Sequence, residues 1–161
     1  MIQVGSFDFK TKPTGIWKWF LHAPTWLFRL RLGFLFGKRM LMIEHLGRKS
    51  GTLFRTVLEV AGRRGDAYVV TSGTGPRADW YRNILAGGVE AVWVGSMRHQ
   101  ASVGQLTSEE AAAVFALYEN DHAKAAAVLM EKMGVEYDGT DDGRVVMMEQ
   151  IPMIEFTLVT E

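Results

Sequence analysis

The sequence predicts an α+β fold, a small antiparallel β-barrel with peripheral helices. Short apolar runs recur between glycine-rich turns over residues 39–106, at a spacing typical of small barrels. Helix signals stand between these runs at residue 79 and after them from residue 107 onward. The chain has 161 residues, enough to bury one core, and neither a repeat nor a low-complexity linker divides it. We therefore expect one domain over residues 15–161, preceded by a mobile arm over residues 1–14.

Each strand is predicted from an apolar run that is bounded by turn signals. The first run leads into Gly47, the second and third flank a hairpin signal over residues 62–66, and the fourth and fifth flank Gly95. A closing strand follows Pro152. The predicted strands cover residues 39–46, 55–61, 67–72, 89–94, 98–106 and 154–160.

Capping signals place the predicted helices. Asp79 begins a short helix that Gly87 ends, because glycine readily takes the left-handed conformation that commonly follows a helix. Thr107 and Glu110 have capping-box spacing, in which the hydroxyl and the carboxylate accept from free N–H groups of the first turn. The predicted helices cover residues 79–86, 107–118 and 121–133, and a last short helix begins near residue 140.

The segment over residues 16–36 is rich in large aromatic side chains and predicts two helical pieces. Pro24 should divide them, because proline removes a helix hydrogen bond and disfavours helix in the preceding residue. Arginines lie among the aromatics, a composition that suits peripheral contact with a membrane surface. The segment equally suits capping the open end of a barrel or a dimer contact, and the sequence leaves these alternatives open.

Composition excludes several kinds of site. The chain has no cysteine, so disulfides, thiolate metal sites and cysteine nucleophiles are excluded. Its four histidines lack metal-ligand spacing, so we expect no metal site. We find neither a signal-peptide pattern nor an apolar run long enough to cross a bilayer, and we expect a cytoplasmic protein.

The zero net charge hides an asymmetry between the two parts of the chain. Residues 1–100 contain 15 Lys/Arg and 6 Asp/Glu, whereas residues 101–161 contain 3 and 12, so the parts carry +9 and −9. A basic half suits nucleic acid, anionic lipid or an anionic cofactor, and the two halves can also attract each other within one fold. No nucleic-acid-binding signature accompanies the basic residues, so we expect no nucleic-acid partner.

Many of these cations surround the turn Gly47-Arg48-Lys49-Ser50-Gly51. Glycine lets the backbone approach a ligand closely, while Arg and Lys supply charge-assisted donors for phosphate oxygens. The turn lacks the glycine spacing of a Walker A loop. Taken alone, it predicts either an anion cradle or a solvated hairpin. His45 lies just before the turn, where a lone histidine is more often structural than catalytic.

Together with later residues, the turn resembles one family. The turn, Arg55-Thr56, the strand end at residues 70–73 and the motif Asp79-Trp80-Tyr81-Arg82-Asn83 follow in the order found in deazaflavin-dependent nitroreductases. These are actinobacterial and archaeal oxidoreductases that use coenzyme F420. The resemblance runs from about residue 40 to about residue 94, and more loosely to about residue 156. It implies a split β-barrel and an enzyme that passes a hydride from the reduced deazaflavin to a quinone, an activated alkene or a nitro compound.

The resemblance also implies site residues. The tail of the cofactor carries a phosphodiester and glutamates, which the cationic turn would hold, and Ser72 at the ring edge is the leading catalytic candidate. Tyr118 and Tyr137 are further candidates, as proton donors or as walls of the substrate pocket. Many family members have a proline shortly after Arg-Thr, where this chain has Val57-Leu58. The implied cofactor-binding residues are Arg48, Lys49, Ser50, Arg55, Thr56, Val57, Leu58, Val70, Thr71, Ser72, Gly73, Asp79, Trp80, Tyr81, Arg82 and Asn83.

A second interpretation comes from a different functional class. The barrel groove would also suit a non-catalytic carrier of a flavin, a tetrapyrrole or a fatty acid. Methionines of the C-terminal part, such as Met147 and Met153, suit an adaptable core and also a pocket for varied apolar molecules. The partner expected from the enzyme interpretation is a small-molecule electron acceptor, and the sequence gives no oligomeric state.

Overall fold

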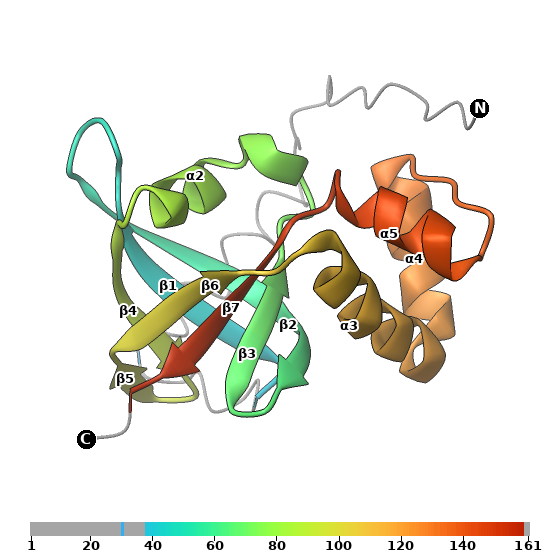
Figure 1. Cartoon of the computed structure of the whole chain (residues 1–161). Coiled ribbons are helices and arrows are strands. Elements are labelled where there is room, and N and C mark those ends of the chain that lie inside the picture. Colours follow the sequence, from blue (N-terminus) through green and yellow to red (C-terminus); the bar gives the residue numbers. More distant parts are fainter. Residues whose placement is uncertain (1–29, 31–37, 160–161) are drawn as a thin grey trace.

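The computed structural model describes residue 30 and residues 38–159 (Figure 1). The strands are β1 (Met40–Leu46), β2 (Leu53–Arg64), β3 (Ala67–Thr71), β4 (Val89–Val94), β5 (Met97–His99), β6 (Ala101–Gln105) and β7 (Met153–Leu158). The helices are the 3-10 turn η2 (Gly75–Arg77), α2 (Asp79–Leu85), α3 (Ser108–Asp121), α4 (Ala123–Met133) and α5 (Asp141–Met148). The predicted arm and the aromatic helical segment lie outside the described residues, apart from the exposed Leu30.

The seven strands form one antiparallel sheet in the order β5-β4-β1-β2-β3-β7-β6. The long strand β2 pairs with β1 over its first part and with β3 over its last part. A register shift between Val60 and Gly62 interrupts its pairing with β3, and such bulges bend a strand. The ends of the sheet come together because β4 contacts β6. The predicted split β-barrel with peripheral helices is confirmed (Figure 1).

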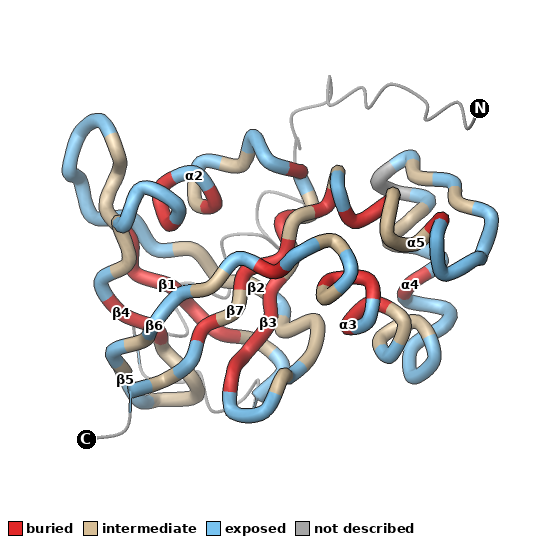
Figure 2. Tube along the Cα trace, viewed as in Figure 1, coloured by how far each residue is buried: buried red, intermediate tan, exposed pale blue. Residues whose placement is uncertain are grey.

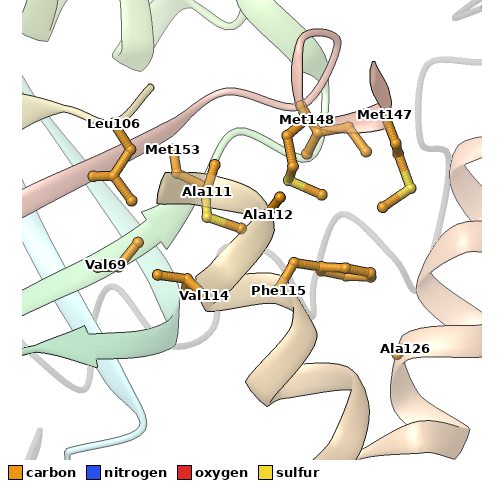
Figure 3. Packing of buried hydrophobic residues seen from close by; sticks show 11 residues of the cluster. Val69, Leu106, Ala111, Ala112, Val114, Phe115, Ala126, Met147, Met148 and Met153 are labelled. Carbon is orange, nitrogen blue, oxygen red and sulfur yellow. The ribbon is translucent and has the colours of Figure 1, made fainter. Parts of the chain in front are cut away.

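Two apolar clusters lie on opposite faces of β3. Val70 faces the barrel interior, where it packs with Leu41, Ile43 and other residues of β1, α2, β4 and β7. The neighbouring Val69 faces the helices and belongs to a cluster that includes Val114 nearby and Met147 farther along (Figure 3). Figure 2 shows buried stretches along β1, β3 and β7. The helical layer packs on the barrel through Val69 of β3 and Met153 of β7, and α3 also contacts β2. The predicted methionine contribution to the core is confirmed.

Several boundaries differ from the predictions for physical reasons. The strand predicted over residues 55–61 continues to Arg64, because residues 62–64 pair with β3, so the hairpin turn is only Gly65-Asp66. The single strand predicted over residues 98–106 is two strands that break at Gln100. β5 pairs with β4 and β6 pairs with β7, so this break carries the chain from one end of the sheet to the other.

Helices lie where the capping signals predicted them, as α2 and α3 show. The capping box is confirmed: the Glu110 N–H donates to Thr107 Oγ1 at 3.2 Å, and the Thr107 N–H donates to Glu110 Oε2 at 2.9 Å.

Arg64 bridges the oppositely charged parts of the chain, with ion pairs to Glu110 at 2.7 Å and to Glu155 at 2.9 Å. Among the described helices, none combines the length and apolar character that crossing a bilayer requires.

Candidate functional site

A cleft of about 550 Å³ opens beside the glycine turn. It lies between the end of β1, the start of β2 and helix α2, and it combines three cationic side chains with the aromatic rings of Phe54 and Trp80. Phe54 is 46% exposed although it is a large apolar residue. The lining residues are His45, Gly47, Arg48, Lys49, Ser50, Phe54, Arg55, Thr56, Thr74, Ala78, Asp79, Trp80 and Asn83.

Backbone hydrogen bonds fix the two walls of the cleft against each other. The Gly47 N–H donates to the Thr52 carbonyl at 2.8 Å, which closes the turn. On the other wall, the Leu46 N–H donates to the Gly88 carbonyl at 2.7 Å, and the Gly88 N–H donates to the Asn83 carbonyl at 3.0 Å. A Cβ at Gly88 would lie 2.7 Å from the Leu46 carbonyl oxygen, so only glycine allows this approach. The end of α2 is thereby held at the end of β1.

Arg48 joins the turn to α2. Its backbone N–H and its NH1 group donate to Asn83 Oδ1, at 3.1 Å and 2.9 Å, and its NH2 group pairs with Asp79 Oδ1 at 3.0 Å. The Arg48 side chain is 21% exposed and that of Asp79 is 84% exposed. Lys49, by contrast, is exposed and makes no polar side-chain contact within the described part of the chain. Its charge is therefore available to a ligand.

A buried histidine continues this network into the cleft. His45 is 3% exposed, as is Asn83. Asn83 Nδ2 lies 3.1 Å from His45 Nδ1, and His45 Nε2 lies 3.0 Å from Thr56 Oγ1. The imidazole also stacks on the Phe54 ring, with centroids 5.8 Å apart. Burial lowers the pKa of His45 below its ordinary value of 6.5, which favours the neutral ring.

Arg55 is oriented by the carboxylate of Glu44. The Arg55 Nε donates to Glu44 Oε1 at 3.1 Å, and the Arg98 Nε donates to Oε2 at 2.9 Å. Burial alone would raise the pKa of Glu44, but the hydrogen bonds and charges of Arg98 and Arg55 hold it below its ordinary value of 4.5. Two guanidinium groups on one carboxylate leave a net positive charge. The terminal nitrogens of Arg55 have no partner within the described part of the chain, so they can serve a ligand.

A sequence model of the F420H(2)-dependent quinone reductase family matches residues 30–133. The chain belongs to this family. It is therefore a reductase that uses reduced coenzyme F420, as the resemblance of its motifs implied. No curated protein matches the chain.

Two solved structures share the fold of this reductase. One, an F420-H2 Dependent Reductase (FDR-A), has 18% sequence identity and a TM-score of 0.50, and the match covers 74% of this chain and 95% of that chain. The other, a domain-swapped dimer, has 17% identity and a TM-score of 0.51, and the match covers 88% of this chain and 99% of that chain.

The cleft brings together half of the cofactor-binding residues predicted for this F420-dependent reductase. Its three cations suit the anionic tail of the cofactor, and its two aromatic rings suit a planar deazaflavin, so the residues present fit the group. The predicted residues that line the cleft are Arg48, Lys49, Ser50, Arg55, Thr56, Asp79, Trp80 and Asn83.

The other predicted cofactor-binding residues lie outside the cleft lining. Val70 belongs to the barrel core, and Leu58 packs against it. Tyr81 is 4% exposed, and its phenol oxygen accepts from Gln105 Nε2 at 2.8 Å. Val57 is half-buried in β2, and Arg82 is exposed on α2. Thr71 and Gly73 line a second cavity instead.

Ser72, the leading catalytic candidate, is fully buried. Its hydroxyl donates to the Gly75 carbonyl at 2.6 Å, where it fixes the turn that leads to η2 and to Thr74 in the cleft wall. Because its proton is already used in this bond, a direct contact of Ser72 with a ligand stays a prediction without geometric support.

The two tyrosine candidates occupy different surroundings. Tyr118 lines an apolar second cavity of about 130 Å³ between β2, β3 and helices α3 to α5, together with Thr71, Gly73 and Met147. Burial raises the pKa of the Tyr118 phenol. Tyr137 lies outside both cavities and donates its phenolic hydrogen to Glu119. Burial and this hydrogen bond raise the pKa of Tyr137.

Sequence reasoning missed Phe54, Thr74, Ala78 and the role of His45 in the cleft. His45 and Phe54 are paired across β1 and β2, so a correct strand register would have placed Phe54 beside the turn. The contact of His45 with Asn83 joins residues 38 positions apart, and no local pattern signals it.

Proposed function

We propose that this reductase holds coenzyme F420 in the cleft beside the glycine turn. The observation that carries the proposal is the presence of three cations and two aromatic rings in one opening. Arg48, Lys49 and Arg55 would bind the phosphodiester and glutamates of the tail, while Phe54 and Trp80 would flank the ring. When bound in its reduced form, the cofactor supplies a hydride.

The residues of the cleft would bind, orient and shield this group. Asn83 and Asp79 already hold the Arg48 side chain in place. Little further conformational entropy of this side chain would therefore be lost when an anion binds. The rings of Phe54 and Trp80 would exclude water from one side of the cofactor, which strengthens the nearby charge interactions. Asp79 offsets part of the positive charge at the outer edge of the cleft.

We further propose that the second cavity receives an apolar part of the electron acceptor, a quinone. Consecutive residues support this arrangement, since Thr74 lines the cofactor cleft and Gly73 lines the second cavity. Its walls are apolar apart from Glu59, Thr71 and the phenol of Tyr118, and methionines there can adapt to varied shapes. Tyr118 would then be the proton donor, and Tyr118→Phe should lower turnover on the order of a hundredfold if it donates.

A titration tests the cofactor proposal. Fluorescence quenching should show tighter binding of coenzyme F420 than of FMN, because only the former has a long anionic tail, and binding should weaken as salt screens the cations. Reduced F420 should be oxidised by menadione only in the presence of the protein. Tighter binding of FMN would refute the proposal. Binding of F420 without oxidation by any quinone, enone or nitroaromatic acceptor would favour the carrier interpretation.

Membrane contact is a separate proposal that rests on the sequence of residues 16–36. An apolar quinone partitions into membranes, which favours a peripheral contact through the aromatic and basic side chains of this segment. Co-sedimentation of the full chain with anionic vesicles at low salt tests it. No pelleting would leave barrel capping or a dimer contact as the role of the segment.

A further inference from the structure

We propose that His45 is a positioning residue that fixes the Thr56 hydroxyl as a hydrogen-bond donor aimed into the cleft. One point of the cleft wall thereby presents a hydrogen-bond donor to an acceptor atom of the ligand, a carbonyl or phosphate oxygen. The inference rests on the proposed function in one respect only, since it takes the ligand to be coenzyme F420. The donor role of the hydroxyl itself follows from hydrogen bonds within the protein.

The contacts of Arg48 fix the orientation of the Asn83 amide. The oxygen and nitrogen of an amide are distinguished by their partners, because only the oxygen accepts. Two N–H groups of Arg48, one from the backbone and one from the guanidinium, point at the same Asn83 atom, at 3.1 Å and 2.9 Å. A guanidinium and a backbone N–H can only donate, so this atom is Oδ1. Asn83 Nδ2 therefore faces His45.

The Asn83 amide in turn fixes the tautomer of His45. Since Asn83 Nδ2 can only donate, His45 Nδ1 at 3.1 Å must accept and carries no proton. In a neutral imidazole the proton then resides on Nε2, which lies 3.0 Å from Thr56 Oγ1. The imidazole N–H thus donates to Thr56. Protonation of Nδ1 would set two donors against each other at Asn83, so the network itself favours the neutral ring.

The His45 tautomer leaves the hydroxyl proton of Thr56 available to a ligand. A hydroxyl has one proton and two acceptor lone pairs, and one lone pair is taken by His45. Within the described part of the chain no acceptor takes the Thr56 proton. Thr56 is half-buried and lines the cleft, so a ligand oxygen there is the partner that remains. The donation from His45 occupies one lone pair, so the proton of the hydroxyl is directed away from the imidazole and is available to an acceptor of the ligand.

The charged surroundings agree with a neutral His45. From the turn, Arg48 contacts Asn83, and Lys49 lines the same cleft. Both cations disfavour an additional positive charge on the His45 ring. From α2, Asp79 already pairs with Arg48, and from β1 and β2, Glu44 already pairs with Arg55 and Arg98. No described carboxylate is thus left to stabilise an imidazolium at this position.

One experiment needs no cofactor. Long-range ¹H–¹⁵N NMR of the full chain with labelled histidine distinguishes the two neutral tautomers, and the His45 signal is assigned by its loss in His45→Gln. We expect Nδ1 without a proton and Nε2 protonated. A proton on Nδ1 at neutral pH would overturn the inference, whatever the protein binds.

A second experiment measures coenzyme F420 affinity in matched variants. Thr56→Val should weaken binding about 3- to 10-fold, the scale of one neutral hydrogen bond, while Thr56→Ser should bind like the parent. His45→Gln places an amide N–H near the position of Nε2 and should also bind like the parent, whereas His45→Ala should lose as much as Thr56→Val. The double variant His45→Ala/Thr56→Val should lose no more than either alone.

The outcomes separate this inference from the proposed function. If the parent fails to bind F420, the proposed function fails and the tautomer still stands or falls by NMR. If the parent binds and Thr56→Val binds equally well, the inference is wrong although the proposed function survives. Should His45→Ala fold poorly, the pair Thr56→Val and Thr56→Ser decides the matter, because neither changes the imidazole.

Discussion

The two neighbouring cations of the glycine turn should respond differently to substitution. Lys49 makes no polar contact within the described part of the chain, whereas Arg48 holds Asn83 and Asp79. We therefore expect Lys49→Ala to weaken cofactor binding and leave the folding free energy unchanged. Arg48→Ala should weaken binding and also destabilise the fold, because it releases α2 from the turn.

The structure sets the size of each effect. The bond from Arg48 NH1 to the buried Asn83 amide involves a charged donor and stabilises by about 1.5–3 kcal/mol. The pair with Asp79 is exposed and contributes roughly 0–1 kcal/mol. The two contributions together are about 1.5–4 kcal/mol. For a chain of this size Tm changes by about 2–4 °C per kcal/mol, so Arg48→Ala should lower Tm by about 3–16 °C. Lys49→Ala should weaken binding by about 1–2 kcal/mol, or roughly 5- to 30-fold.

Two measurements on the same samples decide the matter. Thermal denaturation of the ligand-free proteins gives Tm, and fluorescence titration with coenzyme F420 at low and high salt gives affinity. The Lys49→Ala deficit should shrink at high salt, because the Debye length falls from about 10 Å at 0.1 M to about 3 Å at 1 M. Equal Tm losses in both variants would refute the assigned contacts. Parent-like binding of Lys49→Ala at low salt would refute the role of this cation.

Two further predictions concern the walls of the cleft. Because burial depresses the folded-state pKa of His45, the unfolded chain binds more protons near its ordinary pKa of 6.5, so stability should be complete above pH 6.5 and fall as the pH drops below it. Urea titrations should show this slope at a pH above the range in which carboxylates titrate, and its persistence in His45→Gln would contradict the assignment. Gly88→Ala should destabilise by about 1–3 kcal/mol and weaken F420 binding, since a Cβ would press on two backbone carbonyls of the cleft. Gly73→Ala, where a Cβ has open space, is the control for Tm, and equal Tm in both variants would contradict the close approach at Gly88.

Local patterns predicted the parts of the site that depend on turns. The glycine turn and the Asp79 helix each have their own sequence signal, and the family order indicated that both contact the cofactor. The structure brings Arg48 to 3.0 Å from Asp79, although 31 positions separate them. The strand from Met40 to Leu46 was also predictable, since its apolar run is bounded by the turn.

The remaining site residues could be predicted only from the pairing register of the strands and from the face of the strand that each side chain occupies. Thr56 lines the cleft whereas its neighbour Val57 does not, because successive side chains of a strand point to opposite faces. A continuous run of implied contacts therefore included residues that pack elsewhere. His45 follows a register shift between β1 and β4. Such a shift changes the direction of a side chain, and the apolar periodicity of the sequence does not reveal it.

The alternation of Val69 and Val70 on β3 has a consequence for how the molecule unfolds. The short strand β3 contributes Val69 to one apolar cluster and Val70 to the other. Displacing β3 from either cluster would therefore also disrupt the packing of the other. The helical layer and the barrel should then share one cooperative transition, and the amides of β3 should exchange with solvent only through global opening. Hydrogen exchange that released α3 to α5 well before β3 would indicate that the two layers unfold as separate units.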